Sequence, residues 1–163
     1  MNKTNILPLL SILLLFASAC SDDNEVDKEK PVIDISFSGA FPTNCDTIYF
    51  GEPFVLKMRF SDNLELGAFS IDIHNNFDHH SHSTEVTSCH PDPDKDPVNP
   101  YVSIDDYSIP ESLKEYETNL TISISESDGV ELHDEGDYHF LIRLTDKEGW
   151  SAQKGLSIKM LHR

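Results

Sequence analysis

Basic residues are scarce in this chain of 163 residues, which has 12 lysines and arginines against 29 aspartates and glutamates. Nucleic acid is therefore not expected as a partner, because phosphate binding requires clustered basic side chains. The sequence also lacks a GxSxG nucleophile elbow, a glycine-rich phosphate loop and an HExxH zinc motif, so we do not expect an enzyme. The formal charge of −17 can recruit cations, although keeping the protein soluble is the simpler interpretation.

Long hydrophobic runs are missing as well. The apolar run over residues 6–16 contains Pro8 and spans about 11 residues, whereas a membrane-spanning helix needs about 20. A basic residue, Lys3, precedes the run, and small residues follow it up to Cys20. This order is typical of a cleaved secretory signal peptide, which we place at residues 1–19.

The small residues directly before Cys20 resemble the lipobox of bacterial lipoproteins, in which the cysteine carries the lipid anchor. Residues 20–30 are polar and charged without apolar periodicity, so they are expected to form an acidic tether. Residues 21–25 resemble the surface-export signal of lipoproteins in the Bacteroidota, although a solvated linker has the same composition. We therefore expect a lipid-anchored protein of the outer membrane, displayed on the cell surface, with the periplasmic leaflet as the alternative.

No segment of residues 31–163 has the length and periodicity of a long helix. Short β-branched and aromatic stretches alternate with glycine, proline, asparagine and aspartate, which predicts strands. We place these strands at 32–38, 46–50, 54–61, 68–75, 101–107, 119–125, 138–146 and 152–161. Residues 110–117 can form one short helical turn. Seven or eight short strands in about 130 residues favour a single antiparallel β-sandwich domain over residues 31–163. Residues 145–150 resemble the last turn of bacterial immunoglobulin-like domains, so the expected fold is all-β and immunoglobulin-like.

Alternation separates two faces in the predicted strands at 68–75 and 138–146. Apolar residues occupy every second position in both, which places them on the core side. His74 and His139 occupy the alternate positions. Both histidines are therefore expected to point away from the core.

Histidine is concentrated in residues 74–82, which hold four of the eight histidines of the chain. Imidazole is the commonest protein ligand for zinc and copper, because its neutral nitrogen offers a lone pair at physiological pH. His80 and His82, or His74 with a later residue, can chelate an ion from one face, and His139 can close the site if its strand lies nearby. The alternative is a polar loop that binds metal only adventitiously.

Three aspartates in the acidic loop that follows have the DxDxD spacing that begins many calcium loops: Asp92, Asp94 and Asp96. Pro97 occupies the position where an EF-hand needs glycine, and Ser103 the position where it needs glutamate. Calcium is therefore not expected here, and a solvated loop is the favoured interpretation.

Cys45 and Cys89 remain once Cys20 is assigned to the lipid. Two cysteines in an oxidising compartment most simply form a disulfide, which would pin the base of the histidine-rich segment. The alternatives are that Cys89 and His90 ligate a metal, or that Cys45 is a buried free thiol.

Several stretches together resemble one family: the lipobox, the first strand after Pro31, residues 71–82 (IDIHNNFDHHSH), and residues 137–140 (DYHF) near residues 145–149 (TDKEG). These features are similar to Bacteroidota lipoproteins with a single immunoglobulin-like domain of unknown function, over about residues 30–161. The HNNFDxHxH part is the most specific. The resemblance carries no established activity. We take it to imply four metal-ligating histidines, which are His74, His79, His82 and His139, and His80 is left out of this set.

The leading hypothesis is therefore a lipid-anchored envelope or surface protein that binds a transition metal, zinc or copper first, through the four implied histidines. The alternative is an adhesin-like or glycan-associated module that contacts a protein or glycan through exposed aromatics such as Phe77, Tyr101 and Trp150.

Overall fold

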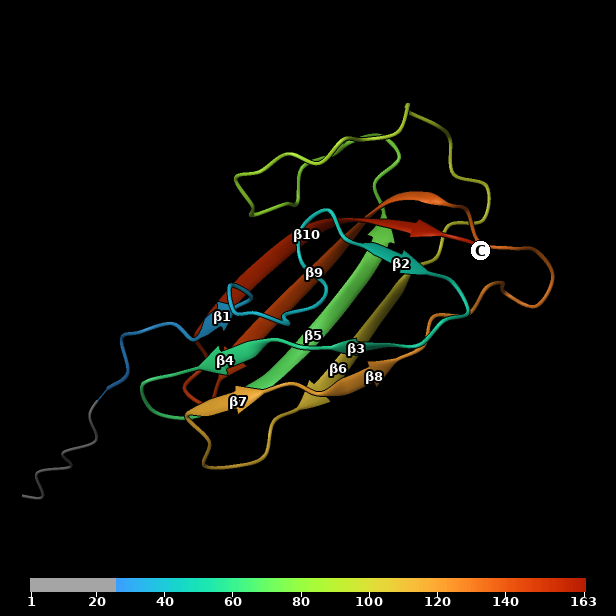
Figure 1. The fold of residues 1–163 in the computed structure, drawn as a ribbon. Helices are drawn as coiled ribbons and strands as arrows, with labels where there is room; N and C mark the ends of the chain where they lie inside the picture. The colour runs from blue at the N-terminus through green and yellow to red at the C-terminus, as the bar shows by residue number, and fades with distance from the viewer. Residues whose placement is uncertain (1–25) are drawn as a thin grey trace, which may run out of the picture.

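The computed structural model describes residues 26–163 (Figure 1). The predicted signal peptide, Cys20 and residues 20–25 of the predicted tether lie outside this range. Residues 26–163 form ten strands joined by turns and loops, and no helix occurs among them. In this part of the chain no helix is therefore long and apolar enough to cross a membrane.

Short turns join most of the strands, loops of intermediate length join β1 to β2 and β8 to β9, and one long connection joins β5 to β6. They are β1 (Val32–Asp34), β2 (Thr47–Tyr49), β3 (Phe54–Leu56), β4 (Arg59–Ser61), β5 (Leu66–Asn75), β6 (Ser103–Ser108), β7 (Glu115–Glu117), β8 (Leu120–Ile122), β9 (Gly136–Asp146) and β10 (Ser151–Leu161).

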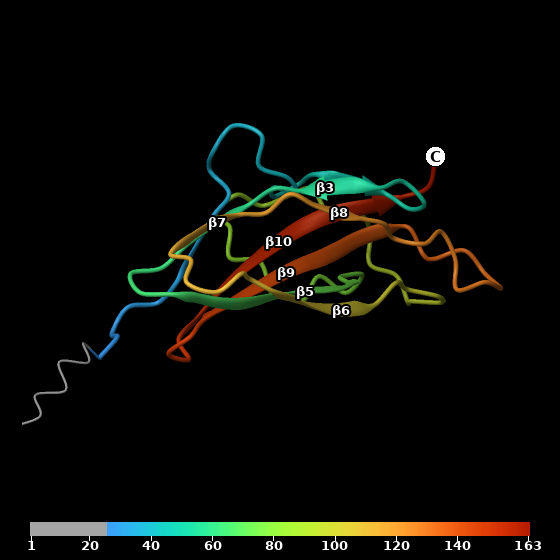
Figure 2. The same cartoon turned by 90° about the horizontal axis from the view of Figure 1, so that it is seen from below.

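Two layers form an antiparallel β-sandwich, which confirms the predicted all-β fold class. One layer is a five-stranded sheet in the order β2-β10-β9-β5-β6, and all its pairs are antiparallel except β2 with β10. The other layer holds the sheet β1-β4-β7 and the pair β3-β8. Figure 2 shows the layers edge-on, with β3, β7 and β8 stacked over β9, β10, β5 and β6.

The number of strands differs from the prediction at two places. The predicted strand at 54–61 is divided into β3 and β4, because Lys57 between them bridges to Phe41 instead. The predicted helical turn at 110–117 was wrong, because its second half forms β7. Tyr116 there pairs with Phe60 of β4, and the two rings lie 6.4 Å apart. A long-range pairing thus overrides a weak local preference.

The predicted core face is confirmed. The alternate apolar residues of β5 and β9 are all buried, and they pack against residues of the opposite layer in one hydrophobic core. The members from these two strands are Phe69, Ile71, Ile73, Tyr138, Phe140, Ile142 and Leu144.

The long connection between β5 and β6 covers the outer face of the five-stranded sheet. Figure 1 shows this segment, coloured green to yellow, arching over the β10 side of the sheet. We call residues 76–90 the histidine loop. The predicted disulfide between Cys45 and Cys89 is present and fastens the end of this loop beside β2. Closing 44 residues into a ring contributes about 4 kcal/mol in the chain-entropy account.

The middle of the histidine loop lies directly on β10. The backbone N–H of Thr84 donates to the carbonyl of Gly155 at 3.0 Å, and the N–H of Gly155 donates to the Thr84 hydroxyl at 3.2 Å. A Cβ atom at Gly155 would lie 1.9 Å from the carbonyl oxygen of His82. Only glycine therefore allows the loop to approach the strand this closely.

Candidate metal centre

His74 and His139 meet on the outer face of the sheet. They lie directly opposite each other in the β5-β9 register, and their ring centroids are 5.4 Å apart. Both side chains point away from the sandwich core, as expected. His139 is nevertheless not exposed to solvent. The histidine loop covers it, so only 1% of its surface is accessible.

His80 and His82 approach the same pair from the histidine loop. The four rings form a compact group, which we call the histidine cluster, with neighbouring centroids 4.9–5.5 Å apart. One nitrogen from each of His74, His80 and His82 lies within 4.8 Å of the others. The Nε2 of His74 is 3.2 Å from the Nδ1 of His82. A tetrahedral ion with bonds of about 2.0–2.1 Å separates its nitrogens by about 3.4 Å, so this spacing suits a shared ion.

Two carboxylates orient the rings of the cluster. The Nδ1 of His74 lies 2.8 Å from Asp72 Oδ1, and the Nδ1 of His80 lies 2.5 Å from Asp78 Oδ1. The hydrogen bond from His80 lowers the pKa of Asp78 below its usual range. With Nδ1 donating to a carboxylate, Nε2 of each ring keeps its lone pair for another partner. Metal-binding histidines have this arrangement, in which the carboxylate fixes the tautomer and the ring direction.

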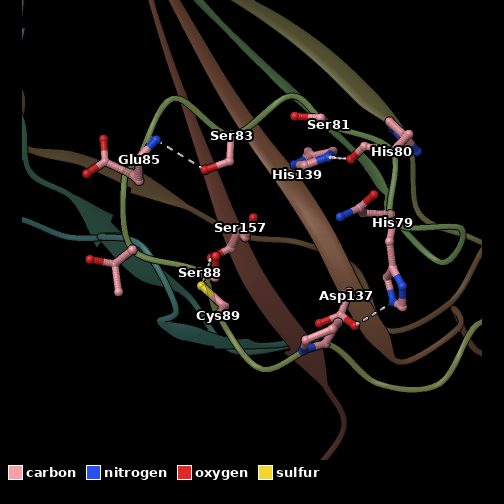
Figure 3. A pocket seen from close by; sticks show the side chains of 13 residues that line it. His79, His80, Ser81, Ser83, Glu85, Ser88, Cys89, Asp137, His139 and Ser157 are labelled. Carbon is pink, nitrogen blue, oxygen red and sulfur yellow. Dashed lines mark hydrogen bonds and ion pairs between the residues drawn. The ribbon is translucent and has the colours of Figure 1, made fainter.

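His139 holds the loop rather than joining the set of three. Its Nε2–H donates to the backbone carbonyl of His80 at 2.9 Å (Figure 3). Burial, opposed by this hydrogen bond and reinforced by the neighbouring histidines, lowers the pKa of His139. Its buried Nδ1 has no hydrogen-bond partner within residues 26–163. A neutral His139 therefore positions His80 through this hydrogen bond from the sheet to the loop backbone.

His79 lies apart from the histidine cluster, although the resemblance implied it as a ligand. Its Nδ1 contacts Asp94 at 2.7 Å and its Nε2 lies 3.8 Å from Asp137, as Figure 3 shows for the second contact. The backbone of His79 is left-handed, with φ of 55°, which turns the next residue to another side. The structure thus brings together His74, His82 and His139 of the implied set, and adds His80 in place of His79.

Two of the three DxDxD aspartates form ion pairs with neighbouring segments. Asp92 contacts Lys159 at 2.5 Å, and its backbone N–H donates to Asp137 at 2.6 Å. Asp94 contacts His79. These contacts fasten the acidic loop to β9 and β10. Residues 91–98 are nevertheless exposed, as expected of the predicted solvated loop.

The aromatics suggested for partner binding have packing roles. Phe77 is only 3% exposed, and its ring lies edge-on to Tyr138 at 5.4 Å. Tyr101 packs on Phe50 in the core at 6.4 Å. Trp150 is 41% exposed, and its indole N–H donates to the carbonyl of Asp27. No stacking platform results from these three residues.

Sequence reasoning missed two features of the site. His80 was left out of the ligand set, although the HNNFDxHxH stretch itself places a histidine at position 80 and a variable residue at position 79. Its Asp78 partner two residues earlier was a second usable signal. Gly155 was not noticed, although a glycine within a strand often marks a close backbone approach. The left-handed backbone at His79 had no signal in the sequence.

The fold and site together define an all-β sandwich with a histidine cluster on the outer face of one sheet, beneath a disulfide-anchored loop. Residues 18–161 match the family described as a domain of unknown function, DUF4625, and the chain therefore belongs to that family. The match covers most of the chain, which is consistent with one domain. Comparison with curated proteins found no match.

Proposed function

We propose that this protein binds a transition-metal ion, zinc or copper, through the imidazoles of His74, His80 and His82. The observation that carries the proposal is the convergence of three ligand nitrogens within 4.8 Å, with two of the rings oriented by carboxylates. Three nitrogens leave a coordination position open to water or another ligand. The three side chains are half-buried or exposed, so an ion can reach them from solvent. Such a site suits metal capture or buffering.

We further propose that the protein is anchored by lipid on Cys20 to the outer membrane and displayed on the cell surface, as in Bacteroidota lipoproteins. The signal-like residues 1–19 support export. The disulfide between Cys45 and Cys89 supports an oxidising compartment, where such bonds persist. In that location the histidine cluster meets metal from the surroundings of the cell.

Metal analysis tests the first proposal. The whole chain is purified in detergent without a nickel column, stripped with chelator and titrated with zinc and copper against a chromogenic competitor. We expect about one equivalent to bind. Loss of a residue that only hydrogen-bonds to a metal ligand typically weakens metal binding by about 10–100-fold. His80→Ala removes a ligand itself, so it should weaken binding by more than about 100-fold.

His79→Ala is the matched control, because His79 is the neighbour of His80 in the chain but faces Asp94 and Asp137. It should leave affinity within about threefold of the unmodified protein. Binding of less than about 0.2 equivalents, or equal losses in the two variants, would overturn the assignment.

A further inference from the structure

A second group of potential ligands lies at the opposite end of the sandwich and consists of carboxylates. Asp27 precedes β1, Asp62 directly follows β4, Asp146 ends β9, and Glu148 lies in the turn before β10. One oxygen from each lies within 4.8 Å of the others. Three segments that are far apart in sequence therefore bring four acidic side chains to one point.

Each of the three aspartates uses Oδ1 to hold the local backbone. Asp27 Oδ1 accepts from the N–H of Glu29 at 3.0 Å and from the side-chain amide of Asn63 at 2.9 Å. Asp62 Oδ1 accepts from a backbone N–H at 2.8 Å. Asp146 Oδ1 accepts from two N–H groups of the following turn, at 2.6 and 2.8 Å. These bonds fix each carboxylate through Oδ1 and do not involve its other oxygen.

The other oxygens lack any partner among residues 26–163. Oδ2 of Asp27, of Asp62 and of Asp146 is buried without a hydrogen bond. Asp27 and Asp146 are themselves only 6% and 5% exposed. The ion pairs formed within residues 26–163 include none of the four acids. Carboxylates at this spacing repel one another, and a cation bound between them would relieve that repulsion.

The chemistry of the oxygens selects the cation. Carboxylate oxygens suit the hard ions calcium and magnesium, whereas zinc and copper prefer nitrogen and sulfur. Oxygens that bind one calcium at about 2.4 Å lie at most about 4.8 Å apart, as these do. Calcium also accepts irregular coordination, whereas magnesium demands a near-ideal octahedron and retains water.

We propose that Asp27, Asp62, Asp146 and Glu148 form a calcium site that fastens the N-terminal segment to the end of the sandwich. The Trp150 indole already holds the carbonyl of Asp27 at 3.2 Å, so an ion would complete a joint between this segment and the β9–β10 turn. Figure 1 shows the N-terminal segment, in blue, entering at the end where that turn lies. Calcium therefore controls how rigidly the sandwich is held by its predicted tether.

The test uses the whole chain in detergent, stripped of metal, with calcium chloride as the probe and magnesium chloride for selectivity. Calcium up to about 5 mM covers the affinities of extracellular modules. We expect one equivalent to bind, the melting temperature to rise, and trypsin cleavage after exposed Lys28 to slow. For a Kd of about 0.1–1 mM, 5 mM calcium is about 5–50 times the Kd. Cleavage should then slow by about 5–50-fold, because it needs the segment to be released.

Two variants separate ligation from folding. Asp62→Asn keeps an oxygen for the local N–H, so it should fold, melt higher than the unmodified protein without calcium, and lose the calcium response. Glu148→Gln, at an exposed position, should weaken binding without a change in the calcium-free melting temperature. Asp105→Asn on exposed β6 is the control and should respond to calcium like the unmodified protein.

Failure to bind calcium at 5 mM, or an unchanged calcium response in both site variants, would overturn the proposal. A magnesium response equal to that of calcium would overturn the choice of ion. His80→Ala should respond normally to calcium, which keeps this test separate from that of the histidine cluster.

Discussion

At the scale of single residues, one backbone angle decides which of two adjacent histidines joins the cluster. The left-handed conformation of His79 sends its ring to Asp94 and Asp137, whereas His80 reaches His74 and His82. The sequence indicated the local density of imidazole correctly. It carried no signal for the sign of this angle, because positive φ is uncommon even for histidine, which adopts it more often than most residues.

Tyr138 is a second residue whose surroundings set a measurable property. Its hydroxyl donates to the carbonyl of Asp134 at 2.6 Å and accepts from the N–H of Tyr101 at 3.1 Å. Burial raises the pKa of Tyr138 to about 12, because the charged phenolate is poorly solvated in the core. The unfolded chain loses this proton near pH 10, so the folded state binds more protons between pH 10 and 12.

We therefore expect Tyr138 to stabilise the fold fully below about pH 10, and this contribution to be lost as pH rises to about 12. The loss should be on the order of 3 kcal/mol, the equivalent of two pKa units. Denaturant unfolding at pH 9 to 12 measures it, and Tyr138→Phe should remove that part of the slope. If the free energy of unfolding falls with pH equally in the unmodified protein and in Tyr138→Phe, Tyr138 does not titrate as described.

At the scale of elements, the sequence predicted the features that local patterns encode. Alternation in β5 and β9 identified the buried face, and the cysteine count identified the disulfide. It did not predict β7, whose place depends on pairing with β4, or the course of the histidine loop across β10. These features arise from contacts between distant segments, which local patterns do not encode.

The contact of the histidine loop with β10 gives a direct prediction at this scale. In Gly155→Ala the new methyl group would overlap the carbonyl of His82, so the loop must shift. We expect a loss of about 1–3 kcal/mol in the free energy of unfolding, the usual cost of overpacking, together with weaker metal binding. Equilibrium unfolding and the metal titration described above measure the two effects.

Ser157→Ala is the matched control, because Ser157 lies two residues further along β10 and on the same face. It removes a hydroxyl and adds no atom toward the loop. If Gly155→Ala and Ser157→Ala bind metal equally well, the close approach of His82 to β10 does not support the site.

At the scale of the whole molecule, the two candidate ion sites lie at opposite ends of the β5-β9 pair. Leu66 pairs with Asp146 at one end, and His74 pairs with His139 at the other. Eight residues of strand at about 3.3 Å each separate these positions by about 26 Å. Asp27, at the first of these ends, lies only a few residues after Cys20 in the chain.

The lipid anchor is tested at this scale by Cys20→Ser. We expect the unmodified protein to sediment with outer membranes and to incorporate a fatty-acid label, and the variant to do neither. The disulfide between Cys45 and Cys89 should persist in the variant, because export depends on residues 1–19 and not on the lipid. Membrane association of the variant equal to that of the unmodified protein would contradict the role of Cys20.

The length of the β5-β9 pair has a further consequence for how the two ions influence each other. At physiological ionic strength, charges screen over about 8 Å, so about 26 Å exceeds three screening lengths. The sandwich between the sites is also a single packed core. Occupancy of one site should therefore leave the affinity of the other unchanged, and the two ions should contribute additively to stability. The molecule would respond to two ions in its environment as two separate signals.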